Sequence, residues 1–476
     1  MFLRQITDPA LAQNAYLIAC QRTGEAIIID PERDVDRYLD LVRENHFKLT
    51  AVADTHVHAD YLSGARELIE NHGTHGYLSA EGGDEWQFEW AKNLNHVTLL
   101  KDGDTFKVGN IQIKALLTPG HTPEHLSFLV TDQGGGAGEP IALLSGDFIF
   151  VGDVGRPDLL ESAAGQTGKM EPAARALYES LRSTSDLPGF VQILPAHGAG
   201  SACGKSLGSV PSSVMDYERL NNPAFRQALQ ESEQNFIETI LSGQPEPPLY
   251  FARMKRDNRA GPALLKNGQL PAPQQIHRDE LTQWLGKPGR RILDLRTQRE
   301  AFMKKHLKGS LFAPASGGSF STVAGSYVGE DDEILLLVEH SESVEPAVRE
   351  LIRIGLDRVT AWMPVSEALN DNSLTSSIPH IPTADLATAI SNQANAQVLD
   401  VRGLSEFQAS HVKDAIQIAH TRLASDSVEI PTGKTLLVHC GSGLRAAMAS
   451  AYLASQNLNV VFLDGDFGDI PKDLIE

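Results

Sequence analysis

Cysteine and positive charge are both scarce in this chain of 476 residues. The three cysteines, Cys20, Cys203 and Cys440, are too few and too far apart for a disulfide framework, so we expect a reducing compartment. Lysine and arginine number 41 against 61 aspartate and glutamate residues, a formal net charge of −20. That balance argues against a nucleic acid or an anionic membrane as partner, and an anionic substrate would need a local positive site.

Long apolar runs are missing as well. No stretch is long enough to span a bilayer, and the first residues, MFLRQITDPALAQ, lack the apolar core of a signal peptide. The sequence therefore predicts a cytoplasmic protein. Hydrophobic residues make up 41% and charged residues 21%, as in ordinary globular proteins. The length exceeds what one hydrophobic core supports and predicts roughly two to four domains.

The stretch THVHADY carries the first candidate site. His56, His58 and Asp60 occupy alternate positions just after LTAVAD, an apolar run typical of a buried strand. Alternate side chains of an extended segment lie on one face, so all three are predicted to enter one pocket. Three later apolar runs each end in a residue that can bind a metal: His121, Asp147 and His197. Because strand ends and their loops converge in layered α/β folds, we expect one metal site; separate hydrogen-bonded loop histidines are the alternative.

The order of these motifs, H-x-H-x-D, Gly-His-Thr, Ser-Gly-Asp and Ala-His-Gly, resembles the metallo-β-lactamase superfamily over about residues 1–250. The resemblance implies an αββα sandwich. Tyr61 stands where that superfamily usually has a histidine for a second metal, and a phenol is a poor substitute for imidazole on zinc. A dinuclear zinc hydrolase of the glyoxalase II type is therefore disfavoured, and a site for one metal is favoured.

The runs THVHADYLSG and GDVGRPDLL look closest to persulfide dioxygenases fused to rhodaneses. That resemblance implies three metal ligands: His56, His121 and Asp147. Two histidines and one carboxylate leave coordination positions open, the pattern of non-haem Fe(II) oxygenases, so we expect one Fe(II) per chain, with zinc as the alternative. Four neighbours would then orient ligands and water: His58, Asp60, Tyr61 and His197.

Two residues near these motifs have uses that the sequence leaves open. Arg156 would meet an anionic substrate or form a structural salt bridge. Cys203 lies six residues after His197 in a glycine-rich segment, and Lys205 beside it would favour thiolate. We hypothesise a catalytic Cys203 that receives or anchors sulfane sulfur near the metal; a small apolar residue filling a turn is the alternative.

An internal repeat follows a connection rich in proline and glycine at residues 242–275. ILDLR at 292–296 matches VLDVR at 398–402, and LLLVEHSESVE aligns with TLLVHCGSGLR. Each copy alternates strands with helical segments and is predicted to form a small α/β domain with a largely parallel sheet. The predicted domains are residues 1–255, 268–375 and 380–476.

The second copy contains the second candidate site, VHCGSGLR. Cys440 follows a strand and precedes the helix predicted at 446–455, so helix-end amides and Arg445 favour its thiolate. Four residues would bind the transferred sulfur through loop amides: Gly441, Ser442, Gly443 and Leu444. This copy resembles rhodanese, and its six-residue loop from Cys to Arg suits sulfur transfer. The first copy has His340 and Glu345 instead, which predicts a catalytically dead domain with a spacer or docking role.

The sequence thus predicts a fusion enzyme of sulfide detoxification. Its first domain would oxidise a low-molecular-weight thiol persulfide with O₂ to sulfite and thiol, and its rhodanese would move sulfur among thiols, sulfite and thiosulfate. We also expect a homo-oligomer. One alternative is a zinc thioester hydrolase of the glyoxalase II type with accessory rhodaneses; another is a non-catalytic sulfur-carrier scaffold. The thiol that carries the persulfide is left open.

Overall fold

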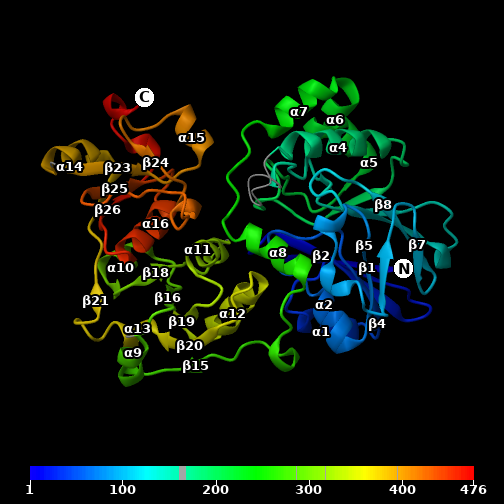
Figure 1. Cartoon of the computed structure of the whole chain (residues 1–476), viewed down its shortest axis with the longest axis horizontal. Helices are drawn as coiled ribbons and strands as arrows, with labels where there is room; N and C mark the ends of the chain where they lie inside the picture. The colour runs from blue at the N-terminus through cyan, green and yellow to red at the C-terminus, as the bar shows by residue number, and fades with distance from the viewer. Residues whose placement is uncertain (160–167, 286, 317, 394) are drawn as a thin grey trace. The chain divides into compact units, whose positions relative to one another are not determined.

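The computed structural model describes residues 1–159, 168–285, 287–316, 318–393 and 395–476 (Figure 1). The chain forms two compact units. The first comprises Met1–Pro247 and Phe251–Gln269, and the second comprises Pro248–Tyr250 and Leu270–Glu476. Within the described ranges, no helix combines the length and the apolarity that crossing a bilayer requires.

The first unit contains two six-stranded sheets. One has the order β1-β2-β3-β4-β5-β6, and the other has the order β14-β13-β10-β9-β8-β7. The first sheet consists of β1 (Phe2–Asp8), β2 (Gln13–Ala19), β3 (Glu25–Ile29), β4 (Lys48–Ala53), β5 (His75–Ser79) and β6 (Val97–Leu100). The second consists of β7 (Thr105–Val108), β8 (Ile111–Leu117), β9 (Leu126–Asp132), β10 (Ala142–Gly146), β13 (Gln192–Pro195) and β14 (Ser213–Val214). A hairpin of β11 (Ile149–Phe150) and β12 (Asp153–Val154) follows β10.

One apolar core lies between the two sheets and another lies outside each of them. Ile18, Ile27 and Ala53 of the first sheet share the central core with Ile113 and Leu144 of the second. The first sheet's outer core includes side chains of α1 (Asp36–Glu44) and α2 (Ala65–His72). The second sheet's outer core includes side chains of α4 (Met170–Ser183), α5 (Met215–Asn221), α6 (Pro223–Gln230) and α7 (Glu233–Leu241). The predicted αββα sandwich is therefore confirmed.

Strand β8 illustrates why the sequence folds this way. Its residues IQIKALL bury Ile111, Ile113 and Ala115, while Lys114 between them is exposed. This two-residue alternation directs one face of the strand into the central core and the other away from it. A further helix, α8 (Phe251–Ala260), lies in the segment 242–275 that the sequence predicts as a connection, and it belongs to the first unit.

The second unit contains two parallel five-stranded sheets with equivalent strand orders, β15-β20-β19-β16-β18 and β22-β26-β25-β23-β24. The first consists of β15 (Gln274–Gln275), β16 (Arg290–Asp294), β18 (Ser310–Phe312), β19 (Glu333–Val338) and β20 (Val359–Pro364). The second consists of β22 (His380–Pro382), β23 (Ala396–Asp400), β24 (Ile416–Gln417), β25 (Thr435–His439) and β26 (Asn459–Asp464). A separate ladder pairs β17 (His306–Leu307) with β21 (Thr375–Ser376).

Helices accompany each of these sheets. The first repeat has α9 (Arg278–Leu285), α10 (Arg299–Lys304), α11 (Ser319–Tyr327), α12 (Val344–Arg353) and α13 (Val365–Ala368). The second repeat has α14 (Leu386–Asn392), α15 (Leu404–Ala409) and α16 (Leu444–Ser455). The two repeats contact each other within the unit: Tyr327 of α11 stacks on Tyr452 of α16 with ring centroids 4.2 Å apart. The Tyr327 hydroxyl also donates to the His420 carbonyl oxygen at 2.5 Å.

The repeated L-D-x-R motif builds the same buried ion pair in both copies. Arg296 Nη2 lies 2.6 Å from Asp294 Oδ2, and Arg402 Nη2 lies 2.6 Å from Asp400 Oδ2. In each copy the same guanidinium also donates to a backbone carbonyl farther along the chain. The motif therefore has a structural use in both copies, whether or not the copy has a cysteine at the position of Cys440.

Candidate functional site

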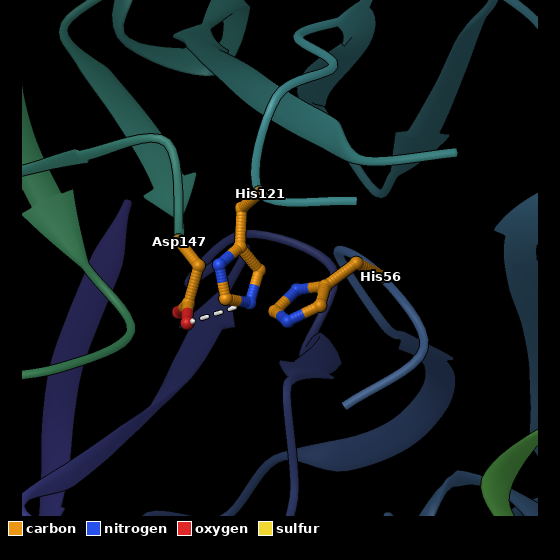
Figure 2. A group of neighbouring side chains, drawn as sticks. All are labelled: His56, His121 and Asp147. Atoms are coloured by element: carbon orange, nitrogen blue, oxygen red, sulfur yellow. Dashed lines mark ion pairs between the residues drawn. The ribbon is translucent and has the colours of Figure 1, made fainter. Parts of the chain in front are cut away.

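Four strand ends of the first unit meet at one place. His56 follows β4, His121 follows β8, Asp147 follows β10 and His197 follows β13. Figure 2 shows His56, His121 and Asp147 converging from three separate loops. One donor atom from each of these three buried residues lies within 4.8 Å of the others, a group that could hold a metal ion.

Two glycines allow these loops to approach each other closely. Gly120 has a φ of +150°, and a Cβ placed on it would lie 2.6 Å from Leu177 Cβ of α4. Gly146 has a φ of +55°, and a Cβ there would lie 2.5 Å from His125 Nε2. Both positions combine a left-handed backbone with a lack of room, so a larger residue would displace His121 or Asp147.

The hydrogen bonds of the histidines leave one nitrogen of each ring available to a metal. His121 Nδ1 donates to the Arg156 carbonyl oxygen at 3.1 Å, so its neutral ring carries the lone pair on Nε2. Thr55 Oγ1 donates to Asp30 Oδ2 at 3.0 Å and can therefore accept from His56 Nδ1 at 2.9 Å. Both tautomers are assigned from these partners, and both present Nε2 to the pocket.

This arrangement brings electron-rich atoms close to one another in a buried pocket. His121 Nε2 lies 3.3 Å from Asp147 Oδ2 (Figure 2). Burial lowers the pKa of His121 to about 4 and holds the pKa of His56 well below its usual value, so neither ring gains a proton readily. Burial also raises the pKa of Asp147 to about 6. A cation between the three donors would compensate them all, so the residues present fit a bound metal ion.

A second group of possible ligands lies on the other side of Asp147: Asp60, His197 and Cys203. His197 Nδ1 lies 3.3 Å from the Ala12 carbonyl oxygen, which leaves Nε2 for the pocket, 3.4 Å from Asp147 Oδ1 and 3.3 Å from Asp60 Oδ2. Neither carboxylate oxygen of Asp60 has a hydrogen-bond partner among the residues the structure describes. The Asp147 carboxylate thus lies between the two groups: Oδ2 is near His121 of the first group, and Oδ1 is near His197 of the second.

Asp30 holds the H-x-H-x-D motif through contacts with Thr55 and His58. Its carboxylate accepts from the Thr55 amide at 2.7 Å and contacts His58 Nε2 at 3.2 Å. Burial opposes the charge on His58, but Asp30 outweighs it and raises the pKa of His58 to about 9. The Tyr61 hydroxyl also lies 3.0 Å from His58 Nε2 and accepts from Gln13 Nε2 at 3.1 Å. His58 and Tyr61 are thereby engaged with each other and with Asp30.

The candidate sulfur-transfer loop lies in the second unit, between β25 and α16. Cys440 is buried, and the Gly443 amide donates to its Sγ at 3.1 Å. Gly443 has a φ of +90° and precedes the first residue of α16. Arg445 pairs with both carboxylate oxygens of Glu406, at 2.6 and 2.8 Å, and these hydrogen bonds raise the pKa of its guanidinium. The loop therefore directs an amide N–H at a thiol, as a persulfide carrier requires.

Comparison with known proteins shows the family of the chain. A crystal structure of a metallo-β-lactamase from Staphylococcus aureus is 38% identical, with a TM-score of 0.66; the match covers 76% of this chain and 98% of that one. The chain belongs to the metallo-β-lactamase superfamily. The profile of that superfamily matches residues 8–197, and the profile of the rhodanese-like domain matches residues 383–471.

Two curated relatives of this superfamily member carry different activities in their names. Persulfide dioxygenase from Bos taurus is 28% identical over 236 residues, which are 48% of this chain and 78% of that protein. Hydroxyacylglutathione hydrolase-like protein from Homo sapiens is 31% identical over 190 residues, 40% of this chain and 57% of that protein. The chain is thus a metallo-β-lactamase-fold protein with a metal-binding site and a rhodanese-like domain.

Arg156 makes the contacts of a structural ion pair. Its guanidinium is buried and donates to Asp158 from Nε at 2.8 Å and from Nη2 at 2.6 Å. The Arg156 backbone joins the metal pocket to the glycine-rich segment, because its carbonyl accepts from His121 and its amide donates to the Cys203 carbonyl oxygen at 3.0 Å. A substrate-binding role for Arg156 stays a prediction.

Cys203 faces the metal pocket, but its surroundings do not favour thiolate. Burial raises the pKa of the thiol well above its usual value, and the carboxylates of Asp60 and Asp147 add to that shift. The Lys205 ammonium, expected to stabilise the thiolate, instead donates to the Ser242 carbonyl oxygen at 2.7 Å. The prediction that Lys205 favours the Cys203 thiolate is therefore wrong, because the Lys205 side chain extends toward Ser242, the residue after α7. The catalytic role of Cys203 stays a prediction.

One residue that the sequence analysis missed holds the H-x-H-x-D loop in place. Asn258 of α8 is buried; its Nδ2 donates to the carbonyl oxygens of His58 and Tyr61 at 2.8 and 2.7 Å. Its Oδ1 accepts from the Ser63 amide at 2.8 Å. No local motif marks this asparagine, because its partners lie about two hundred residues away in the sequence.

We predict that Asn258→Ala weakens metal binding about 10- to 100-fold, the usual cost of losing a residue that orients metal ligands. The variant frees two carbonyls and one amide that α8 now satisfies, so the loop can drift from its ligand geometry. Metal titration of metal-free protein measures the effect. Asn235→Ala, on the exposed surface of α7, is the control and should bind metal as the wild type does. Equal metal affinity in both variants would show that Asn258 does not hold the metal-binding loop in place.

Proposed function

We propose that this protein is a persulfide dioxygenase coupled to a sulfurtransferase. The first unit would convert a thiol persulfide, O₂ and water into thiol, sulfite and two protons: RSSH + O₂ + H₂O → RSH + SO₃²⁻ + 2H⁺. Four electrons pass from the terminal sulfur to dioxygen. The observation that carries the proposal is the buried group of two neutral imidazoles and one carboxylate, His56, His121 and Asp147, on a chain that also has a rhodanese-like domain.

The chain's own residues would divide the work as follows. His56, His121 and Asp147 would hold one Fe(II), which supplies the capacity to react with dioxygen. Arg156 and Thr55 fix the ring orientations of His121 and His56 through Nδ1. The side chains of His56, His121 and Asp147 are buried, which would limit the access of bulk water to the bound metal.

The rhodanese-like domain would use the sulfite that the first unit produces. In the first step a persulfide transfers its terminal sulfur to Cys440: the donor S–S bond breaks, a Sγ–S bond forms and the donor thiolate leaves with the electron pair. In the second step sulfite attacks the terminal sulfur, releases the Cys440 thiolate and leaves as thiosulfate. The net reaction, RSSH + SO₃²⁻ → RSH + S₂O₃²⁻, needs no further oxidant. The Gly443 amide, which donates to Cys440 Sγ, would stabilise the sulfur anion in both steps.

Metal content measured together with oxygen uptake tests the proposal. Purified protein should contain one iron per chain and consume O₂ with a low-molecular-weight persulfide, and sulfite and thiosulfate together should equal the O₂ consumed. Metal-free protein should regain this activity with Fe(II) and not with Zn(II). Active protein that holds two zinc ions and consumes no oxygen would refute it.

A zinc thioester hydrolase is the second candidate, and one observation favours it. Asp60, His197 and Cys203 form a second possible ligand group beside the first, with Asp147 between the two. Two-metal hydrolases require such adjacent groups. Hydrolysis of a glutathione thioester by the zinc-loaded protein, with no oxygen uptake by the iron-loaded form, would establish this function instead.

We predict that Cys203→Ser retains iron but forms less thiosulfate, or uses small persulfides differently, because the thiol lies beside the metal pocket. Serine keeps nearly the same volume, so the substitution tests chemistry more than packing. Product analysis across several persulfides measures the change, with Cys20→Ser as the control. Equal rates and product ratios would leave Cys203 with a structural role only.

A further inference from the structure

The first repeat, although it lacks the catalytic cysteine, contacts the Cys440 loop directly. Arg299, the first residue of α10, donates from Nη1 to the Ser442 carbonyl oxygen at 3.0 Å. Its Nη2 lies 2.7 Å from Asp464 Oδ1, at the end of β26. The side chain is thus held at both ends of its guanidinium, and one of its partners is a residue of the candidate sulfur-transfer loop.

The Ser442 carbonyl that Arg299 contacts belongs to the same peptide unit as the Gly443 amide, which donates to Cys440 Sγ. Ser442 C=O and Gly443 N–H are the two polar groups of one peptide bond, and in a planar trans peptide they point in opposite directions. Arg299 holds the carbonyl on one side, and the amide donates to Cys440 Sγ at 3.1 Å on the other. A rotation of this peptide would break both hydrogen bonds together. A positively charged donor on the carbonyl also polarises the amide and strengthens its donation to sulfur.

Packing supports the same arrangement. A Cβ placed on Gly443 would lie 2.9 Å from Arg299 Cζ, so the guanidinium lies against the bare backbone of this glycine. Arg445, the arginine of the loop itself, is occupied by both oxygens of Glu406. Tyr327 of the first repeat stacks on Tyr452 of α16, the helix that follows the Cys440 loop. The first repeat therefore supports both the loop and its helix.

We propose that Arg299 is a positioning residue for sulfur transfer at Cys440, which gives the first repeat a role in the reaction of the second. It fixes the peptide between Ser442 and Gly443 so that its amide stabilises the sulfur anion of Cys440 and of its persulfide. The inference rests on the proposed sulfur transfer and deepens it. It replaces the expected spacer role of the first repeat with a contribution to the site, made by a residue whose position no catalytic motif marks.

The test follows the loading of Cys440 by thiosulfate in the whole protein, with the persulfide detected as a gain of one sulfur by mass spectrometry. Arg299→Ala should lower the maximal loading rate about tenfold, the order expected for one charge-assisted hydrogen bond, with a less than about twofold change in the half-saturating thiosulfate concentration. Arg299→Lys keeps a charged donor and should recover part of the rate. Arg358→Ala removes a half-exposed arginine of the same repeat that pairs with Glu333, and it should load at the wild-type rate.

Three outcomes would overturn the inference. If Arg299→Ala loads Cys440 at the wild-type rate, the peptide between Ser442 and Gly443 does not depend on Arg299. A rise confined to the half-saturating concentration would make Arg299 a direct anion ligand and not a positioning residue. Equal slowing in Arg358→Ala would assign the effect to general destabilisation. If wild-type protein itself forms no Cys440 persulfide with thiosulfate or a thiol persulfide, the proposed function fails first, so the two failures are distinguishable.

Discussion

Replacing Cys440 with serine should reduce sulfur transfer from thiosulfate to the background rate. The sulfur of Cys440 is the atom to which the transferred sulfur would bond, and serine offers no nucleophile that forms a persulfide. Oxygen uptake with a small persulfide should continue, because the metal ligands lie in the first unit and share no residue with the Cys440 loop. Sulfite should accumulate where the wild type forms thiosulfate.

Matched measurements make this result interpretable. Cys20→Ser changes another buried cysteine, between β2 and β3, and should transfer sulfur at the wild-type rate. Metal content and thermal unfolding of Cys440→Ser should match those of the wild type, since oxygen and sulfur differ little in size at this site. Loss of oxygen uptake by a folded, iron-loaded Cys440→Ser protein would contradict the two-site proposal.

The sequence predicts the parts of this protein that depend on local patterns. Apolar runs and their polar ends located β4, β8, β10 and β13, because a buried strand must be apolar and its end is where a ligand can project. The internal repeat predicted two similar α/β folds, and the equal strand orders of the two parallel sheets agree with it. These features come from residues close together in the chain.

The residues that the sequence did not reveal act over long separations. Asn258 holds the loop around His58, and Arg299 holds the loop of Cys440, although each lies more than a hundred residues from its partners. Asp30 carried a usable signal, since it ends the apolar run EAIIID at the same edge as the other strand ends. Lys205 was expected to act on Cys203 because the two are close in sequence. Its long side chain instead donates to the Ser242 carbonyl oxygen, which sequence proximity does not predict.

Replacing Asp147 with asparagine, or His121 with alanine, should remove iron and oxygen uptake together. Each of the two residues supplies one of the three donors, and losing a donor costs more than the 10- to 100-fold in affinity that losing an orienting neighbour costs. Metal analysis after dialysis and oxygen-electrode measurements record both effects. His72→Ala, an exposed histidine at the end of α2, is the control and should keep both iron and activity.

Asp147→Asn also makes a prediction about stability that distinguishes a metal ligand from a structural residue. In metal-free protein the Asp147 carboxylate is buried, and burial raises its pKa, so the fold carries a destabilising charge. Removing that charge should leave the metal-free protein as stable as the wild type or more stable. The wild type should gain about 2.7 kcal/mol when free metal exceeds its dissociation constant a hundredfold, and the variant should gain almost none. A metal-free Asp147→Asn protein that unfolds more easily than the metal-free wild type would mean that the carboxylate serves the fold and not a bound ion.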